Sequence, residues 1–449
     1  MSRPSEPGAE TNLGAETNED GRVNRVPAAL RPAVLWAGFA LVHGLVIWLC
    51  LVAPGWPLGD VEMVYRGWAE AAASGHYVVG IDTDFVYPIL AFLPIIAALA
   101  AGPALYTVSW LGIVTLLDAA AFALLIDSGN RRALRAAWWW IAFLALLGPI
   151  ALARIDSVTV PLVIIALLWL GRRPLWGAAL LTVATWVKVW PVAAIAALFV
   201  VSKARWRVLA AAAGTSAVIV VVALVLGSGL HVFSFISQQA ARGIQIESPV
   251  SIIWLWQAAF KVPGSYLYYD HQILTFQVTG NGIHVAIALM TPLLALAVAA
   301  VLMLGWLAMR GHADHLRLFP PLVLALVVTL IAFNKVGSPQ FMGWLAAPVI
   351  LGLVLRGAAW RTPAILVAVM AALTQLVYPY LYDYLLAAHP LMVLVLTLRN
   401  LLEFVLLGWA LREIWMLGAR AGLPAVVGIR RTASRATEPR TVLNTDLKE

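Results

Sequence analysis

Two carboxylates directly follow the first long apolar stretch of the chain. Asp60 and Glu62 come at its end, and the aromatic residues Tyr65 and Trp68 follow at helical spacing. A carboxylate held at the membrane surface can take a proton from a hydroxyl group, which is the task of a general base. A solvated interfacial helix with an aromatic belt has the same residue pattern, so the residues alone leave both interpretations open.

Charged residues also lie between apolar runs, where they are costly unless they are paired or functional. Arg154 and Asp156 occur in ALARIDSVTVP, and Lys188 occurs in ATWVKVWP. A bound phosphate would explain the presence of Lys188, the deepest of these cations. The alternatives are an ion pair between Arg154 and Asp156, and a lysine that extends its amine to the interface at a helix break.

Two further segments combine a cation with amide, carboxyl and hydroxyl groups. They are RGIQIESP and NKVGSPQF, and their polar residues are Arg242, Gln245, Glu247, Ser248, Asn334, Lys335, Ser338 and Gln340. Such a set suits the hydrogen-bonding groups of phosphate and of sugar hydroxyls. Glycine and proline flank both segments, so capped turns are the alternative interpretation.

Several enzyme motifs are absent from the sequence. It contains no GxxxxGKS/T, HExxH or G-x-S-x-G motif and no Cys/His cluster, so nucleotide hydrolysis, zinc proteolysis and serine hydrolysis are not supported. The 8 histidines are dispersed, and we expect neither a metal site nor a cofactor. The single cysteine, Cys50, excludes an intramolecular disulfide.

The composition shows which elements must position these residues. Of the 449 residues 62% are hydrophobic and only 12% are charged, whereas soluble domains average about 25% charged residues. Apolar runs of roughly 20 residues recur, and each can cross a hydrocarbon core of about 30 Å. The net charge of +8 comes from basic residues at the ends of these runs, which indicates membrane topology and argues against nucleic-acid binding. The sequence therefore predicts an all-α polytopic membrane protein.

The apolar runs predict where the membrane spans lie, at 33–53, 104–126, 136–153, 157–171, 207–227, 284–309, 317–333, 340–356, 361–378 and 390–416. The stretches 86–101 and 175–200 do not fit as single crossings. The second should enter and return, because Lys188 and Pro191 interrupt it near its middle. About twelve membrane segments follow.

The basic residues near the span ends predict the orientation of the chain. The following groups should be cytoplasmic: Arg22, Arg25, Arg31, Arg131, Arg132, Arg135, Arg172, Arg173, Lys203, Arg205, Arg207, Arg310, Arg317, Arg356, Arg361, Arg412, Arg420, Arg430 and Arg431. The outer loops are then 54–86, the turn at 154–156, 228–283, 334–340 and 378–389. Within the longest of them, residues 249–260 form a short apolar stretch that should lie in the membrane interface.

With these motifs the chain resembles glycosyltransferase family 87, the polyprenyl-phosphate-mannose-dependent mannosyltransferases of the GT-C class. The resemblance covers roughly residues 33–380. It rests on an ordered set of short motifs: GD-x-x-x-Y (Asp60, Tyr65), FVYP (Tyr87, Pro88), ARID (Arg154, Asp156), VKVWP (Lys188, Pro191), RGIQIES (Arg242 to Ser248) and NKVGSPQF (Lys335, Ser338, Gln340). The family's YPP motif reads Tyr87-Pro88-Ile89 here, without the second proline.

The resemblance implies a GT-C type bundle with outer-face loops and interfacial helices. It also implies transfer of a mannosyl residue, with inversion, from a polyprenyl-phosphate donor to a glycolipid or glycan acceptor. The reaction would occur on the outer face of the cytoplasmic membrane, with Asp60 as the general base. The residues expected to bind the donor phosphate and sugar are Lys188, Arg154, Asp156, Arg242, Gln245, Glu247, Lys335, Ser338, Gln340, Tyr65 and Tyr87.

Some alternatives stay open at this point. Polyprenyl-phosphate-arabinose is a second possible donor, and a multi-span transporter or flippase is a rival class, although no matching pair of interrupted spans is visible. We expect Tyr65, Trp68 and residues 249–260 to shape the sugar and lipid grooves. The domains expected are a disordered cytoplasmic N-terminus (1–30), a transmembrane GT-C domain (31–418) and a disordered basic cytoplasmic tail (419–449).

Overall fold

The computed structural model describes residues 31–240 and 242–421, and both predicted disordered termini lie almost entirely outside this range. Only residues 419–421 of the predicted tail are described, and they continue the last helix. Most of the described chain is helical. Eight of its helices are long and apolar enough to cross a membrane, which agrees with the all-α polytopic fold predicted from the sequence.

Each predicted span is present as a helix or as the main part of one. These helices are α1 (Pro32–Val52), α4 (Tyr106–Asp127), α5 (Arg131–Leu147), α6 (Asp156–Trp169), α9 (Arg205–Val225), α12 (Ile283–Arg310), α13 (His315–Ala332), α15 (Ala346–Arg356), α16 (Arg361–Gln375) and α18 (Pro390–Ala421). Helix α6 is not one of the eight long helices, and α15 and α16 belong to a single helical stretch, Phe341–Tyr380. Two of these helices begin at side-chain caps that satisfy free backbone N–H groups. Asp314 accepts from the N–H of Leu316 at 2.8 Å, and Asn130 accepts from the N–H of Arg132 at 2.8 Å.

The stretch 175–200 breaks where the sequence predicts. Helix α7 (Pro174–Val187) ends at Lys188, which is extended, and α8 (Val192–Val201) begins after Pro191. At 1.5 Å per residue these helices are only about 21 Å and 15 Å long, too short to cross about 30 Å alone. The stretch 86–101 is likewise divided into short turns and the helix α3 (Phe92–Ala97).

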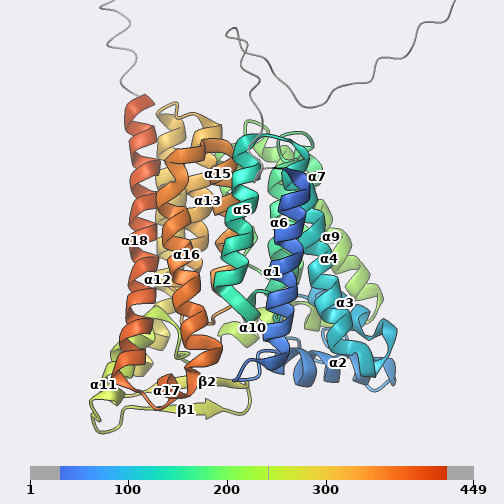
Figure 1. The fold of residues 1–449 in the computed structure, drawn as a ribbon, viewed down its shortest axis with the longest axis vertical. Helices are drawn as coiled ribbons and strands as arrows, with labels where there is room; N and C mark the ends of the chain where they lie inside the picture. The colour runs from blue at the N-terminus through green and yellow to red at the C-terminus, as the bar shows by residue number, and fades with distance from the viewer. Residues whose placement is uncertain (1–30, 241, 422–449) are drawn as a thin grey trace, which may run out of the picture.

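The short elements gather at one end of the bundle, opposite the start of α1 and the end of α18 (Figure 1). They include the π-helix η2 (Asp60–Tyr65), α2 (Arg66–Ala73), α10 (Ser234–Ala240), α11 (Ile252–Ala259), α14 (Phe341–Trp344) and α17 (Tyr382–Leu386). This is the end at which the predicted outer loops lie. The bundle core surrounds α13, whose side chains are almost all buried between neighbouring helices.

A β-hairpin at the same end was not predicted. Strand β1 (Tyr266–Asp270) pairs antiparallel with β2 (Thr275–Thr279), with Tyr266 opposite Thr279 and Asp270 opposite Thr275. The two segments, YLYYD and TFQVT, are rich in the aromatic and branched residues that favour strands. The hairpin reaches over the end of the bundle and covers part of the site described below (Figure 1).

Candidate active site

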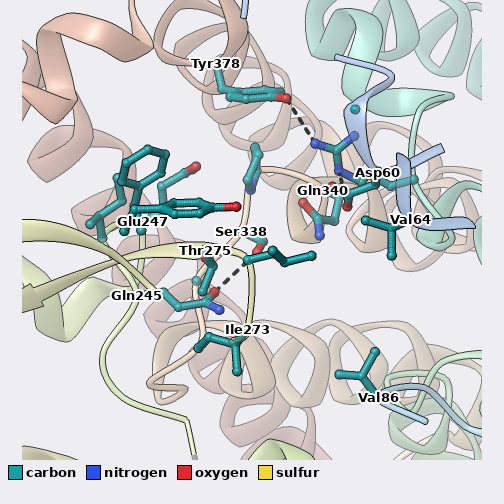
Figure 2. Close-up of a pocket in the computed structure, with 18 of the residues that line it drawn as sticks. Asp60, Val64, Val86, Gln245, Glu247, Ile273, Thr275, Ser338, Gln340 and Tyr378 are labelled. Atoms are coloured by element: carbon teal, nitrogen blue, oxygen red, sulfur yellow. Dashed lines mark hydrogen bonds and ion pairs between the residues drawn. The ribbon is translucent and has the colours of Figure 1, made fainter. Parts of the chain in front are cut away.

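A cavity of about 720 Å³ lies among the short elements, and segments far apart in the sequence line it. They are parts of the first loop (55–68), the segment 84–87, the segment 238–247, the hairpin tip (269–276), the turn 337–340 and the segment 378–386. Figure 2 shows side chains from these segments pointing into a common space. The volume is typical of a pocket that holds a small molecule.

Most of the predicted site residues line this cavity, namely Asp60, Tyr65, Tyr87, Arg154, Arg242, Gln245, Glu247, Ser338 and Gln340. Lys188, Asp156 and Lys335 are not among its lining residues. Trp68 lines the cavity as expected, but residues 249–260 do not. Helix α11 in that segment packs instead beside α18 and the hairpin.

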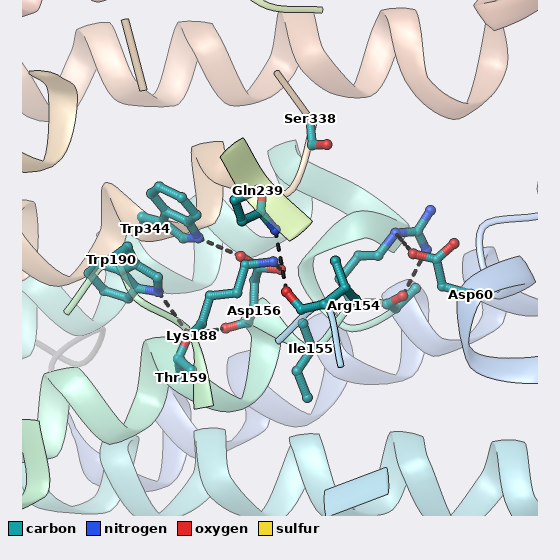
Figure 3. A network of polar contacts seen from close by, with 12 residues as sticks. Asp60, Arg154, Ile155, Asp156, Thr159, Lys188, Trp190, Gln239, Ser338 and Trp344 are labelled. Carbon is teal, nitrogen blue, oxygen red and sulfur yellow. Dashed lines mark hydrogen bonds and ion pairs between the residues drawn. The ribbon is translucent and has the colours of Figure 1, made fainter. Parts of the chain in front are cut away.

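Asp60 is the first residue of η2, and its side chain is 41% exposed at the cavity. It forms an ion pair with Arg154, whose Nε lies 3.2 Å from its Oδ2. This ion pair was not predicted from the sequence. It forms because the first loop folds onto the turn before α6, which brings Arg154 to Asp60 (Figure 3).

The guanidinium of Arg154 is buried and has protein partners on all of its nitrogens. Besides Asp60, it donates to the carbonyls of Pro57 and Ala153 and, at 3.0 Å, to the hydroxyl of Tyr378. These contacts join the first loop to the segment after α16. Arg154 therefore orients Asp60, and little of its hydrogen-bonding capacity remains for a ligand.

Asp156 points away from Arg154 and pairs with Lys188, with Nζ and Oδ2 3.2 Å apart. Its other oxygen accepts from the indole N–H of Trp344 at 2.7 Å (Figure 3). The amine of Lys188 also lies 4.5 Å from the ring centre of Tyr87, which lines the cavity. The structure therefore does not contain the alternative ion pair between Arg154 and Asp156. Arg154 pairs with Asp60, and Asp156 pairs with Lys188.

Arg242 is the cation that the structure leaves most available to a ligand. Among the described residues, Arg154 and Arg242 are the lysine or arginine side chains that line the cavity. The Nε of Arg242 is buried and has no hydrogen-bond partner in the described part of the chain. A buried donor without a partner is costly, so an anion bound in the cavity would satisfy it.

The two polar segments predicted as ligand-binding loops pack directly against each other. The N–H of Gln245 donates to the carbonyl of Lys335 at 3.0 Å, and the hydroxyl of Ser338 lies 3.5 Å from the amide oxygen of Gln245. A Cβ on Gly337 would overlap the backbone of Ser248, so only glycine allows this approach. Lys335 itself is buried behind the cavity wall, and burial lowers its pKa.

A cluster of buried charges behind Glu247 was missed in the sequence. Arg399 of α18 donates to the carbonyl of Glu247 at 3.0 Å, lies 3.5 Å from its carboxylate and lies 3.6 Å from that of Glu403. Burial raises the pKa of Glu247 to about 7, against the opposing charges of Arg399 and Arg154. Arg399 and Glu403 lie four residues apart inside the apolar run 390–416, and this charged pair was the signal that could have revealed the cluster.

Two tyrosines that line the cavity were also missed. Tyr378 holds Arg154, and Tyr382 packs against Tyr378 with ring centres 5.1 Å apart. Both belong to YPYLYDY (378–384), which was predicted to lie in an outer loop without a role. In residues 31–240 and 242–421, no group of three or more His, Cys, Asp or Glu side chains is placed to hold a metal ion. The expectation of no metal site stays a prediction.

Comparison with known proteins links this site to one family. Residues 85–262, less than half of the chain, match the model of glycosyltransferase family 87. The matched region contains Arg154, Lys188 and Arg242 but begins after Asp60. No curated protein and no solved structure matches the chain. Together with the ordered motifs, the family match supports the assignment of the chain to glycosyltransferase family 87.

Proposed function

We propose that this membrane glycosyltransferase transfers a mannosyl residue from a polyprenyl phosphate to a glycolipid or glycan acceptor outside the cytoplasmic membrane. The coarser function, a glycosyltransferase with membrane-spanning helices, rests on the family match and the apolar helices. The finer proposal rests mainly on one observation. Asp60, a partly exposed carboxylate, and Arg242, a cation with an unsatisfied donor, line the same cavity.

In the proposed reaction Asp60 takes the proton of an acceptor hydroxyl. The acceptor oxygen then forms a bond to the anomeric carbon of the donor, and the bond from that carbon to the phosphate oxygen breaks on the opposite face. The electron pair leaves with the polyprenyl phosphate, so the configuration inverts. Proton transfer by a placed base contributes about two to four orders of magnitude in rate.

The other cavity residues have matching tasks in this proposal. Arg242 binds the phosphate and stabilises its increasing negative charge as the sugar leaves. Arg154 orients Asp60 through the ion pair. Gln245, Ser338 and Gln340 offer amide and hydroxyl groups to the sugar, and the rings of Tyr87 and Trp68 form an apolar wall, with their centres 6.4 Å apart.

The function is tested with purified protein in proteoliposomes. Polyprenyl-phosphate-mannose with a labelled sugar is added together with a membrane glycolipid extract, and polyprenyl-phosphate-arabinose is tested in parallel. We expect labelled mannose in a new product of inverted configuration and an equal amount of free polyprenyl phosphate. Transfer of arabinose alone would contradict the mannosyl assignment, and movement of intact donor across the bilayer without transfer would indicate a transporter.

A further inference from the structure

A second pocket lies at the opposite end of the bundle from the candidate active site. It has a volume of about 420 Å³ and is lined by the first turns of α5 and α16 and by the connection from α15 to α16. Arg132, Arg135 and Arg361 contribute guanidinium groups to it. This is the end that the basic residues predict to be cytoplasmic.

The three arginines have no carboxylate near them in the described part of the chain. None of them is in an ion pair there, and no Asp or Glu lines the pocket. Arg132 donates to the carbonyl of Leu355 at 3.2 Å, which holds it at the pocket. Neighbouring Arg356, by contrast, is 3.0 Å from Glu413. All three arginines are exposed, so solvent screens part of their mutual repulsion, and a bound anion would relieve the remainder.

The remainder of the pocket is apolar. Trp139 forms part of its wall and bridges α5 to α16, because its indole N–H donates to the carbonyl of Ala364 at 2.9 Å. Ile365 lines the same side and is 62% exposed. Cations at the end of the bundle and an apolar wall towards the membrane match the two halves of a phospholipid.

We propose that this pocket binds the headgroup phosphate of an anionic phospholipid, with one acyl chain along Ile365. Basic pockets between membrane helices are known to recognise such headgroups. A soluble phosphate would use the same guanidinium groups but would gain nothing from the apolar wall. This pocket shares no lining residue with the candidate active site, so lipid binding here does not depend on the proposed reaction.

The test compares the wild type with the triple variant R132Q/R135Q/R361Q. Each detergent-purified protein is titrated with phosphatidylglycerol and with phosphatidylcholine of equal chain length, and native mass spectrometry counts the bound lipids. Each arginine near an anionic headgroup contributes about fivefold in affinity, so the triple variant should bind phosphatidylglycerol about a hundredfold more weakly. Its binding of phosphatidylcholine should stay unchanged.

The matched control is R172Q/R173Q/R207Q, which removes three exposed arginines from the same end but outside the pocket. It should bind phosphatidylglycerol as the wild type does. Equal binding by the wild type and the pocket variant would overturn the site, as would an equal loss in the control.

Inorganic phosphate and glycerol 3-phosphate distinguish the source of the anion. We expect neither to displace phosphatidylglycerol from the wild type at millimolar concentration. If either did so, and if the wild type showed no preference between the two lipids, the pocket would be a soluble-anion site and the lipid assignment would be wrong.

Discussion

The ARID motif contributes to two acid–cation pairs that differ in their surroundings. Arg154 pairs with Asp60, whose side chain is 41% exposed at the cavity, whereas Asp156 and Lys188 have side chains only 3% and 15% exposed. Both pairs have a separation of 3.2 Å. The separation of the charges therefore does not distinguish a pair at a ligand-binding cavity from a pair that supports the fold. The exposed fraction of the acid distinguishes them. The acid of the outer pair is accessible from the cavity, while the inner pair links α6 to the break between α7 and α8.

The largest effect on stability should come from breaking the inner pair. Asp156→Asn leaves Lys188, whose side chain is only 15% exposed, without its counter-charge, and an unpaired buried charge typically costs about 3–5 kcal/mol. We expect a strong loss of folded protein, measured by thermal unfolding in detergent. A variant that unfolds like the wild type would show that Lys188 finds another partner, and the inner pair would then not be a structural support.

The next effect concerns Arg242, whose Nε has no hydrogen-bond partner in the described part of the chain. Arg242→Gln removes the charge that we assign to the donor phosphate, and a hydrogen bond to a charged group is worth about 1.5–3 kcal/mol. Donor binding should weaken by roughly tenfold to a hundredfold, while thermal stability changes little. Binding of polyprenyl-phosphate-mannose to the purified variant is the measurement. Lys261→Gln, in the turn after α11 and outside the cavity, is the control and should bind the donor normally.

A smaller effect should appear in the pH dependence of stability. The pKa of Glu247, about 7, is above its ordinary value of 4.5, so the folded protein binds this proton more tightly than the unfolded chain. The stability from this group is complete below about pH 4.5 and is lost as the pH rises through 7. Glu247→Gln resembles the protonated form and should lack this part of the decline in Tm.

The charged groups that face Glu247 are Arg399, Glu403 and Arg154, and all remain in this variant. The measurement is Tm between pH 5 and 8. Glu62→Gln is the control, because Glu62 lies outside the cavity and contacts Trp56 and Thr107. If Glu247→Gln shows the wild-type slope, Glu247 does not titrate in this range.

The smallest effect on stability should come from the outer pair. Asp60→Asn removes a charge that solvent partly screens, because the acid is 41% exposed. The buried Arg154 keeps the carbonyls of Pro57 and Ala153 and the Tyr378 hydroxyl as acceptors, so the loss should be well below the roughly 3–5 kcal/mol of an unpaired buried charge. We expect the Tm to stay close to that of the wild type, in contrast to Asp156→Asn. Equal destabilisation by the two substitutions would remove the distinction between the pairs.

Local sequence patterns predicted the helices better than they predicted the pairs. Each span follows from a run of apolar residues, and the break at Lys188 follows from a charge beside Pro191. The pairing of Asp60 with Arg154 depends on two distant segments meeting in the fold, which no local pattern records. The hairpin was missed because its strands were read as part of a long loop, and Arg399 because it lies inside an apolar run.

In the reaction that we propose, Asp60 removes a proton from the acceptor while the donor is already bound. The most direct measurement is the single-turnover rate of sugar transfer from prebound donor by Asp60→Asn, with Glu62→Gln as the control. Asp60→Asn should bind the donor normally and keep its Tm, but transfer the sugar about a hundredfold or more slowly, while Glu62→Gln transfers at close to the wild-type rate. A wild-type transfer rate in Asp60→Asn, or a loss explained entirely by unfolding or weaker donor binding, would contradict the assignment of Asp60 as the base.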